Sequence, residues 1–417
     1  MYKHIQFSFA FLTVFLISYE FSIANCDFTG NNPAGGQNFV CDTDPPNPDT
    51  IAVVTGDNND NVTVLTGAGI DAPDDAIATM GGDDTIIIDG GNTPQDVVIG
   101  SSNAIDSGAG NDDVTVNGGF LEGFNDAIRT QSGDDRVVVS GATLTSLSFN
   151  SIHTEAGMDE VIVNNSILTS SNFNAIETDD DDDYVEFNGG IINCGGDCIK
   201  TEDGDDIIMV NTFGSQPATI ISTGENAIDS GMGNDRVTVI GATLQGNPND
   251  GIFTTSGDDT VIVEDAIISS VNFHPVNTSS GNDNVILRGG ELIALSPSGL
   301  SIRLGSEDDT VRIERQTSLT GLMDGEDGID TLIFALDFSS LSECEAVKMQ
   351  ISSLTGDDSI TIDEFNYSWI NFEVFEDQII CPGQKIIPTL SQWGLIAMAG
   401  VLGIAALLII RRSRAAA

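Results

Sequence analysis

Aspartate recurs at nearly constant spacing through most of this chain. Most steps are 23 or 24 residues, and the full range is 21 to 29. The thirteen members of this column are Asp60, Asp84, Asp112, Asp135, Asp159, Asp183, Asp206, Asp235, Asp259, Asp283, Asp309, Asp330 and Asp358. A repeat of this length is typical of solenoids, in which each unit buries its apolar face against the next one.

Apolar residues keep step with the aspartates. The second and fourth residues after each aspartate are always apolar, as in Asp135-Arg136-Val137-Val138-Val139, and this period of two predicts a β-strand. Residues 127–130 and 142–144 predict two further short strands in the same unit. Gly133 stands where the chain must turn. We therefore expect an all-β fold, a right-handed parallel β-helix of about 24 residues per coil and roughly 13 coils.

Two polar columns also follow the repeat. Asn or Asp lies nine residues before most of the aspartates, and Thr or Ser lies five residues before them, as Asp126 and Thr130 do for Asp135. Stacked side chains of these types hydrogen-bond between coils, so we interpret both columns as structural ladders.

The N-terminal residues predict export. Residues 1–24 combine Lys3, an apolar run and a small-residue cleavage site, the pattern of a signal peptide. The alternative is a lipoprotein acylated at Cys26. Six cysteines fall in three local pairs, which favours disulfides in an exported chain; a metal site at Cys194 and Cys198 is the weaker alternative. We assign residues 25–50 to an N-terminal cap, 51–365 to the repeats and 366–386 to a C-terminal cap or linker.

The C-terminal residues predict a membrane segment. Residues 395–410 are uninterruptedly apolar and are followed by three arginines, which predicts a hydrophobic transmembrane helix with a cytoplasmic end. The sequence before it resembles the IPTL-CTERM sorting signal through Ile387, Pro388, Thr389, Leu390, Trp393 and Gly394. The resemblance implies an exosortase-type membrane peptidase, a Gram-negative-type envelope, and delivery to the cell surface or extracellular matrix. The alternative is a permanent anchor that is never cleaved.

The aspartate turns loosely resemble RTX-type calcium-binding repeats, as in Gly108-Ala109-Gly110-Asn111-Asp112. RTX arrays repeat every nine residues, whereas here one such turn occurs per coil. The formal charge of −50 also favours bound cations. Carboxylates stacked about 5 Å apart would repel each other by about 0.9 kcal/mol per pair in water, and a bound cation would relieve this repulsion. We therefore predict Ca²⁺ at Asp84, Asp112, Asp135, Asp159, Asp183, Asp206, Asp235, Asp259 and Asp283. The alternative is a set of solvated acidic turns neutralised by diffuse sodium and magnesium.

The coil length resembles that of right-handed β-helices that degrade pectin. Gly196-Asp197-Cys198-Ile199-Lys200 faintly resembles the Asp-Asp-Cys element of polygalacturonases, but the His-Gly and Arg-Ile-Lys elements of that family have no counterpart. We therefore expect no enzyme but an exported surface or matrix protein with a structural or adhesive role. Its expected partners are surface glycans or matrix polymers, and the charge excludes nucleic acid. The alternative is a carbohydrate-active enzyme, either a polysaccharide lyase or a hydrolase.

Overall fold

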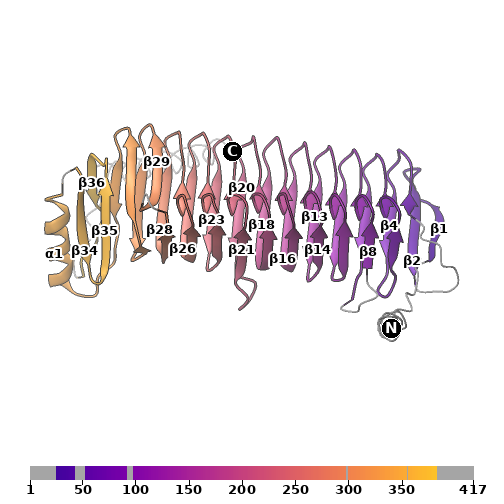
Figure 1. The fold of residues 1–417 in the computed structure, drawn as a ribbon, viewed down its shortest axis with the longest axis horizontal. Coiled ribbons are helices and arrows are strands. Elements are labelled where there is room, and N and C mark those ends of the chain that lie inside the picture. Colours follow the sequence, from indigo (N-terminus) through magenta and orange to yellow (C-terminus); the bar gives the residue numbers. More distant parts are fainter. Residues whose placement is uncertain (1–24, 43–51, 92–96, 297–298, 355, 383–417) are drawn as a thin grey trace, which may run out of the picture.

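The computed structural model describes residues 25–42, 52–91, 97–296, 299–354 and 356–382 as one long rod (Figure 1). The rod is a right-handed-type β-solenoid of about 12 turns with ~24 residues per turn. The predicted fold class is therefore confirmed for this part of the chain. The predicted signal peptide, the predicted sorting signal and the hydrophobic segment lie outside the described residues.

Most coils contribute three short strands, as the repeat predicted, and in four coils the first two are one continuous strand of 11 residues. The first two strand columns lie in one large sheet, and the third forms a second sheet. The first column contains β2 (Gln37–Asp42), β4 (Asn61–Val64), β7 (Thr85–Ile88), β10 (Asp113–Asn117), β13 (Arg136–Ser140), β16 (Glu160–Ser170), β18 (Tyr184–Cys194), β20 (Ile207–Asn211), β23 (Arg236–Ile240), β26 (Thr260–Ser270), β28 (Asn284–Ala294), β30 (Thr310–Arg315), β33 (Thr331–Phe334) and β36 (Val374–Asp377). The second contains β5 (Ile70–Ala72), β8 (Val97–Gly100), β11 (Phe120–Gly123), β14 (Thr143–Ser146), β21 (Ala218–Ser222), β24 (Thr243–Gly246), β31 (Ser318–Leu319) and the second halves of β16, β18, β26 and β28.

The third column consists mostly of strands of two residues. It contains β3 (Val53–Val54), β6 (Ile77–Ala78), β9 (Ile105–Asp106), β12 (Ile128–Arg129), β15 (Ile152–His153), β17 (Ile176–Glu177), β19 (Ile199–Lys200), β22 (Ile228–Asp229), β25 (Ile252–Phe253), β27 (Val276–Asn277), β29 (Leu300–Ser306), β32 (Leu322–Asp327), β35 (Phe365–Ile370) and β34 (Asp358–Ile362). From β3 to β35 these strands pair in parallel, one coil with the next.

The core is a set of apolar columns that run along the rod. Val114, Val137 and Val161 are register partners on consecutive coils, and each is fully buried. Ile128 and Ile152 form the matching column in the second sheet and are also fully buried. Because every coil covers the apolar face of its neighbours, burial is shared along the whole stack.

Glycine is required where consecutive coils touch at their turns. Gly133 has φ +135°, and a Cβ there would lie 2.0 Å from the carbonyl oxygen of Gly110 in the preceding coil. An alanine at Gly133 would therefore both strain the backbone and collide with the neighbouring turn.

The two ends of the rod have different caps. At the N-terminal end, β1 (Asn25–Asn31) pairs antiparallel with β2, and Cys26 is bonded to Cys41. At the other end stand α1 (Leu341–Ile351) and the antiparallel pair β34–β35, with a disulfide between Cys344 and Cys381. The disulfides predicted from the paired cysteines are thus confirmed.

The thirteenth predicted coil is not part of the parallel stack. Asp358 is exposed and begins β34, whose apolar residues Ile360 and Ile362 face the cap in an antiparallel hairpin. Helix α1 lies between Asp330 and this segment in the chain. The alternating strand pattern therefore recurs here after the last parallel coil has ended. The expected thirteen coils are therefore corrected to about 12.

Candidate functional sites

The aspartate column forms a ladder inside the rod, directly before the first strand of each coil. Its twelve members from Asp60 to Asp330 are only 0–3 % exposed. All nine residues predicted to bind metal belong to it, so the structure does bring them into one column. The alternative of solvated acidic turns does not hold for these carboxylates, because they are buried.

One oxygen of each ladder carboxylate holds the neighbouring coil. The backbone N–H of Asp135 donates to Oδ1 of Asp159 at 2.8 Å, and the N–H of Asp159 donates to Oδ1 of Asp183 at 2.8 Å. The same bond joins successive members from Asp60 to Asp330, with N–O distances of 2.6–2.9 Å. The ladder thus satisfies a row of backbone donors that the strand pairing leaves open.

The second oxygen of each ladder carboxylate, Oδ2, is buried without a hydrogen-bond partner. The hydroxyl of Thr130 approaches the Asp135 carboxyl and lowers its pKa, although the contact falls short of a hydrogen bond to Oδ2. Burial outweighs this effect and raises the pKa of Asp135 to about 7. From Asp84 to Asp330, burial raises the ladder pKa values to between about 6 and about 9.

These raised pKa values reduce the repulsion between stacked carboxylates from which calcium binding was predicted. A carboxylic acid that keeps its proton near neutral pH is uncharged and does not repel its neighbours. A proton on Oδ2 can also be donated in a hydrogen bond to the oxygen of the nearby hydroxyl. Calcium takes six to eight oxygen ligands, and each ladder residue already commits Oδ1 to a backbone amide. Calcium binding at the ladder stays a prediction.

A second polar column lies one residue before the ladder and faces solvent. Among its members, Asp134, Asp205 and Asp258 are exposed. These side chains also accept backbone amides, but in the opposite direction: the N–H of Met158 donates to Asp134 of the preceding coil at 3.2 Å. Solvated acidic turns are therefore present, one residue away from the predicted position.

Charged side chains on the outer face of the second sheet form ion pairs. Arg129 pairs with Glu155, Lys200 with Glu202, and Arg303 with Glu326. These basic residues are therefore engaged and are not free to bind an acidic sugar.

One group of side chains on this face was not predicted from the sequence. Among the described residues, His153, Glu177 and Asp179 are the group of three metal-ligating side chains whose ligand atoms all lie within 4.8 Å of one another. The signal in the sequence was weak because their columns also contain Arg, Lys and Gly in other coils.

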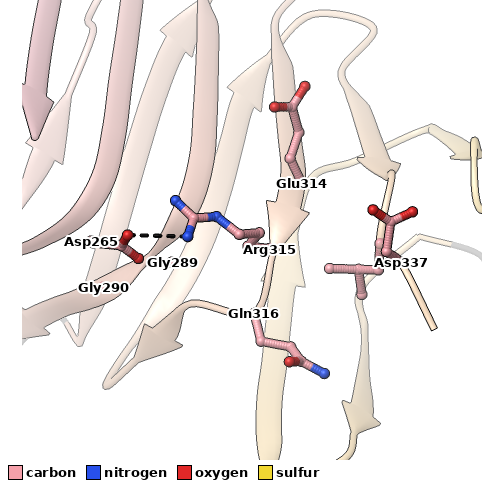
Figure 2. A pocket seen from close by; sticks show the side chains of 8 residues that line it. Asp265, Gly289, Gly290, Glu314, Arg315, Gln316 and Asp337 are labelled. Carbon is pink, nitrogen blue, oxygen red and sulfur yellow. Dashed lines mark hydrogen bonds and ion pairs between the residues drawn. The ribbon is translucent and has the colours of Figure 1, made fainter. Parts of the chain in front are cut away.

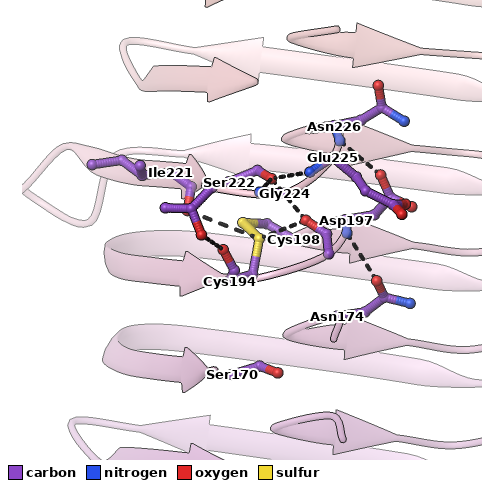
Figure 3. The surroundings of a disulfide bond; sticks show 12 residues. Ser170, Asn174, Cys194, Asp197, Cys198, Ile221, Ser222, Gly224, Glu225 and Asn226 are labelled. Carbon is purple, nitrogen blue, oxygen red and sulfur yellow. Dashed lines mark hydrogen bonds between the residues drawn. A yellow bond between two sulfur atoms is a disulfide. The ribbon is translucent and has the colours of Figure 1, made fainter. Parts of the chain in front are cut away.

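The middle disulfide closes one turn of the rod. Cys194 is bonded to Cys198 between the second and third strand columns, which rules out the alternative metal site at these cysteines (Figure 3). Asp197 lies within this turn, and its buried side chain accepts the backbone N–H of Asn226 at 2.8 Å. Burial and the nearby Asp229 raise the pKa of Asp197 to about 8, and burial raises that of Asp229 to about 6.

A surface pocket of about 410 Å³ lies near the C-terminal coils (Figure 2). Arg315 occupies it and pairs with Asp265 at 3.0 Å and with Glu264 at 3.1 Å. Because both carboxylates neutralise this guanidinium, the pocket has no free cation with which to bind an anionic ligand.

Comparison with known proteins identifies the C-terminal signal. Residues 387–414 match the family model of the IPTL-CTERM motif. The chain carries an IPTL-CTERM sorting signal. The motif marks an exported protein of the Gram-negative envelope or surface and implies processing by an exosortase-type enzyme at the membrane.

The remaining comparisons add no relative. No curated protein and no solved structure matches the chain. Within the described part, no helix is long and apolar enough to cross a membrane. The predicted membrane helix at 395–410 and the IPTL-CTERM residues themselves lie outside that part.

Proposed function

We propose that this chain is a non-catalytic rod of the cell surface or extracellular matrix, with a structural and adhesive role. The IPTL-CTERM signal supports the location, and the stiff stack of coils supports a spacer that holds a binding surface away from the membrane. A row of exposed phenylalanines carries the adhesive part of the proposal.

The phenylalanines lie in the turns between the second and third strand columns. Phe149 and Phe173 belong to consecutive coils, and their ring centroids are 5.2 Å apart. Phe124 belongs to the coil before them, and the three side chains are 44–54 % exposed. Rigid aromatic rings that remain exposed together supply contact area at low entropic cost, and they suit the apolar faces of sugar rings in a glycan or matrix polymer.

A binding screen tests this role. The full chain, purified in detergent, would be passed over immobilised surface glycans and matrix polymers. We expect at least one polymer to be retained, and Phe149→Ser with Phe173→Ser to weaken binding roughly tenfold. Phe273→Ser is the matched control, because Phe273 occupies the same turn position and is 47 % exposed but lies four coils from Phe173. Equal binding by the double variant and the control would contradict the proposed surface.

The sorting signal makes a separate prediction about the mature chain. If the peptidase cuts near the motif, protein recovered from native envelopes should lack residues 395–417, and intact mass will show this directly. Replacing Ile387 and Trp393 by alanine should leave the chain uncut and missorted. A mature chain that still ends at Ala417 would instead support the permanent anchor.

The raised pKa values of Asp197 and Asp229 favour the enzymatic alternative. Their pKa values of about 8 and about 6 resemble the acid and base pair that a glycoside hydrolase needs. Incubation with a panel of neutral and acidic polysaccharides would test it. Release of reducing ends or unsaturated sugars that disappears in Asp197→Asn would overturn the non-catalytic proposal.

A further inference from the structure

His153, Glu177 and Asp179 come from two consecutive coils and meet on the outer face of the second sheet. His153 in β15 and Glu177 in β17 are register partners, so their side chains stand side by side. Asp179 follows Glu177 by two residues, in the turn. Nε2 of His153 lies 3.1 Å from Oδ2 of Asp179, and all three ligand atoms lie within 4.8 Å of one another.

The neighbouring Asn150 gives a second and independent indication of a ligand. In the asparagine and aspartate ladder, the side-chain oxygen usually accepts the backbone N–H of the next coil, as Asp126 does for Asn150 and Asn174 does for Asp197. Asn150 breaks the pattern. Its side chain turns toward Glu177 and donates to the carboxylate, and its Oδ1 is left buried without a partner although the residue is only 3 % exposed. An unsatisfied acceptor therefore lies beside three potential ligands.

The local charge balance leaves the group negative. One coil away on either side, Arg129 is bonded to Glu155 and Lys200 to Glu202, so both flanking cations are already engaged. The carboxylates of Glu177 and Asp179 then share a single imidazole. A divalent cation would neutralise both of them and leave the imidazole uncharged.

We propose that His153, Glu177 and Asp179 bind one divalent transition-metal ion of the Zn²⁺ class. One imidazole nitrogen and two carboxylate oxygens form a ligand set that such ions accept, at about 2.0–2.2 Å from the metal. Ligand atoms around one tetrahedral ion lie about 3.4 Å apart, so the 3.1 Å between Nε2 and Oδ2 needs little change. Three protein ligands leave a coordination position open on an outer face, where the side chain of Asp179 is 37 % exposed.

Metal titration of the full chain tests the site. The protein, stripped with EDTA and purified in detergent, would be titrated with Co²⁺ while its visible absorption is followed, and then with Zn²⁺. We expect one equivalent of Co²⁺ to give d–d bands of an imidazole-containing site, and one equivalent of Zn²⁺ to remove them. His153→Asn and Glu177→Gln should each weaken binding at least tenfold.

Asp106→Asn is the matched control, because Asp106 occupies the column of His153 two coils earlier. It should leave the spectrum and the stoichiometry unchanged. Circular dichroism and melting temperature would show that all variants fold. Weak binding of several equivalents without d–d bands, unchanged in His153→Asn, would assign the metal to the acidic surface and overturn the site. This result is independent of the adhesion screen, so either proposal can fail alone.

Discussion

Asp258 and Asp259 are neighbours in the chain and are both aspartates, yet the fold treats them in opposite ways. Asp258 is exposed, and hydrogen bonds from the backbone and side chain of Asn282 lower the pKa of its carboxyl. Asp259 is 1 % exposed, and burial raises its pKa to about 6. A difference of one residue in a strand-like turn moves a side chain from one side of the chain to the other.

The two columns also tolerate different residues. The outer column mixes aspartate and asparagine with one methionine and one isoleucine, as at Asn111, Asp134, Met158 and Ile329. The inner ladder is aspartate in all twelve buried positions from Asp60 to Asp330. A protonated aspartate offers one acceptor and one donor, whereas an asparagine offers two N–H donors, of which a single nearby hydroxyl can accept only one. The inner position therefore needs the carboxyl itself.

The largest expected effect is a loss of stability as the pH rises. An aspartate whose pKa is raised in the folded state binds its proton more tightly there than in the unfolded chain. Its stabilising contribution is complete below the unfolded pKa of about 3.9 and is lost as the pH rises through the folded pKa, here from about 6 to about 9. We expect the melting temperature to fall by about 10 °C or more between pH 5 and pH 9.

The outer column provides the control for this pH dependence. Asp182 is exposed whereas Asp183 is buried, so Asp182→Asn should leave the slope nearly unchanged and Asp183→Asn should reduce it. A melting temperature that rises or stays constant from pH 5 to pH 9 would show that the ladder is ionised in the folded rod.

The second prediction compares truncation in the two columns. Asp183→Ala leaves the backbone N–H of Asp159 buried without an acceptor, which costs about 1–3 kcal/mol. Asp182→Ala removes an exposed side chain and should change the free energy of unfolding by no more than about 0.5 kcal/mol. Chemical denaturation of both variants measures the difference. If the two variants lose the same stability, the inner hydrogen bond contributes nothing that the outer one does not.

A smaller effect is expected from amide replacement. Asp159→Asn keeps the acceptor for the N–H of Asp135 but brings an additional buried donor, so we expect a loss of about 1 kcal/mol at pH 5. Asp134→Asn should be neutral, since asparagine already occupies the equivalent outer position at Asn111. Thermal melts at pH 5 measure both changes. Equal stability of Asp159→Asn and the unchanged chain would refute the donor-count explanation of the uniform ladder.

The coil architecture was predictable because Val137 and Val139 repeat in every unit with the period of a strand. The burial of Asp135 was also present in that pattern: it has the same parity as these valines, so it faces the same side of the chain. The end of the stack was not predictable, because Ile360 and Ile362 keep the strand pattern in a hairpin. The contact between His153 and Asp179 depends on how two consecutive coils align. Because the residue types in their columns vary from coil to coil, no periodic pattern in the sequence predicts it.

The smallest expected effect concerns calcium. At pH 8 part of the ladder is ionised, so a divalent ion that binds the folded rod should raise the melting temperature by a few degrees in millimolar calcium relative to EDTA. At pH 5 the protonated ladder should give no such shift. Equal melting temperatures at pH 8 and matched ionic strength would leave only charge screening and remove specific calcium binding.

The strands cross the long axis of the rod (Figure 1), so the hydrogen bonds that pair consecutive coils run along that axis. A pulling force along the axis would load the coils one after another, so the weakest junction yields first. The three disulfides close the N-terminal hairpin, one turn and the C-terminal cap, and none joins two coils of the central stack. Under tension the rod should therefore lengthen coil by coil from the junction that fails first, and each coil that opens should release about 24 residues of extensible chain.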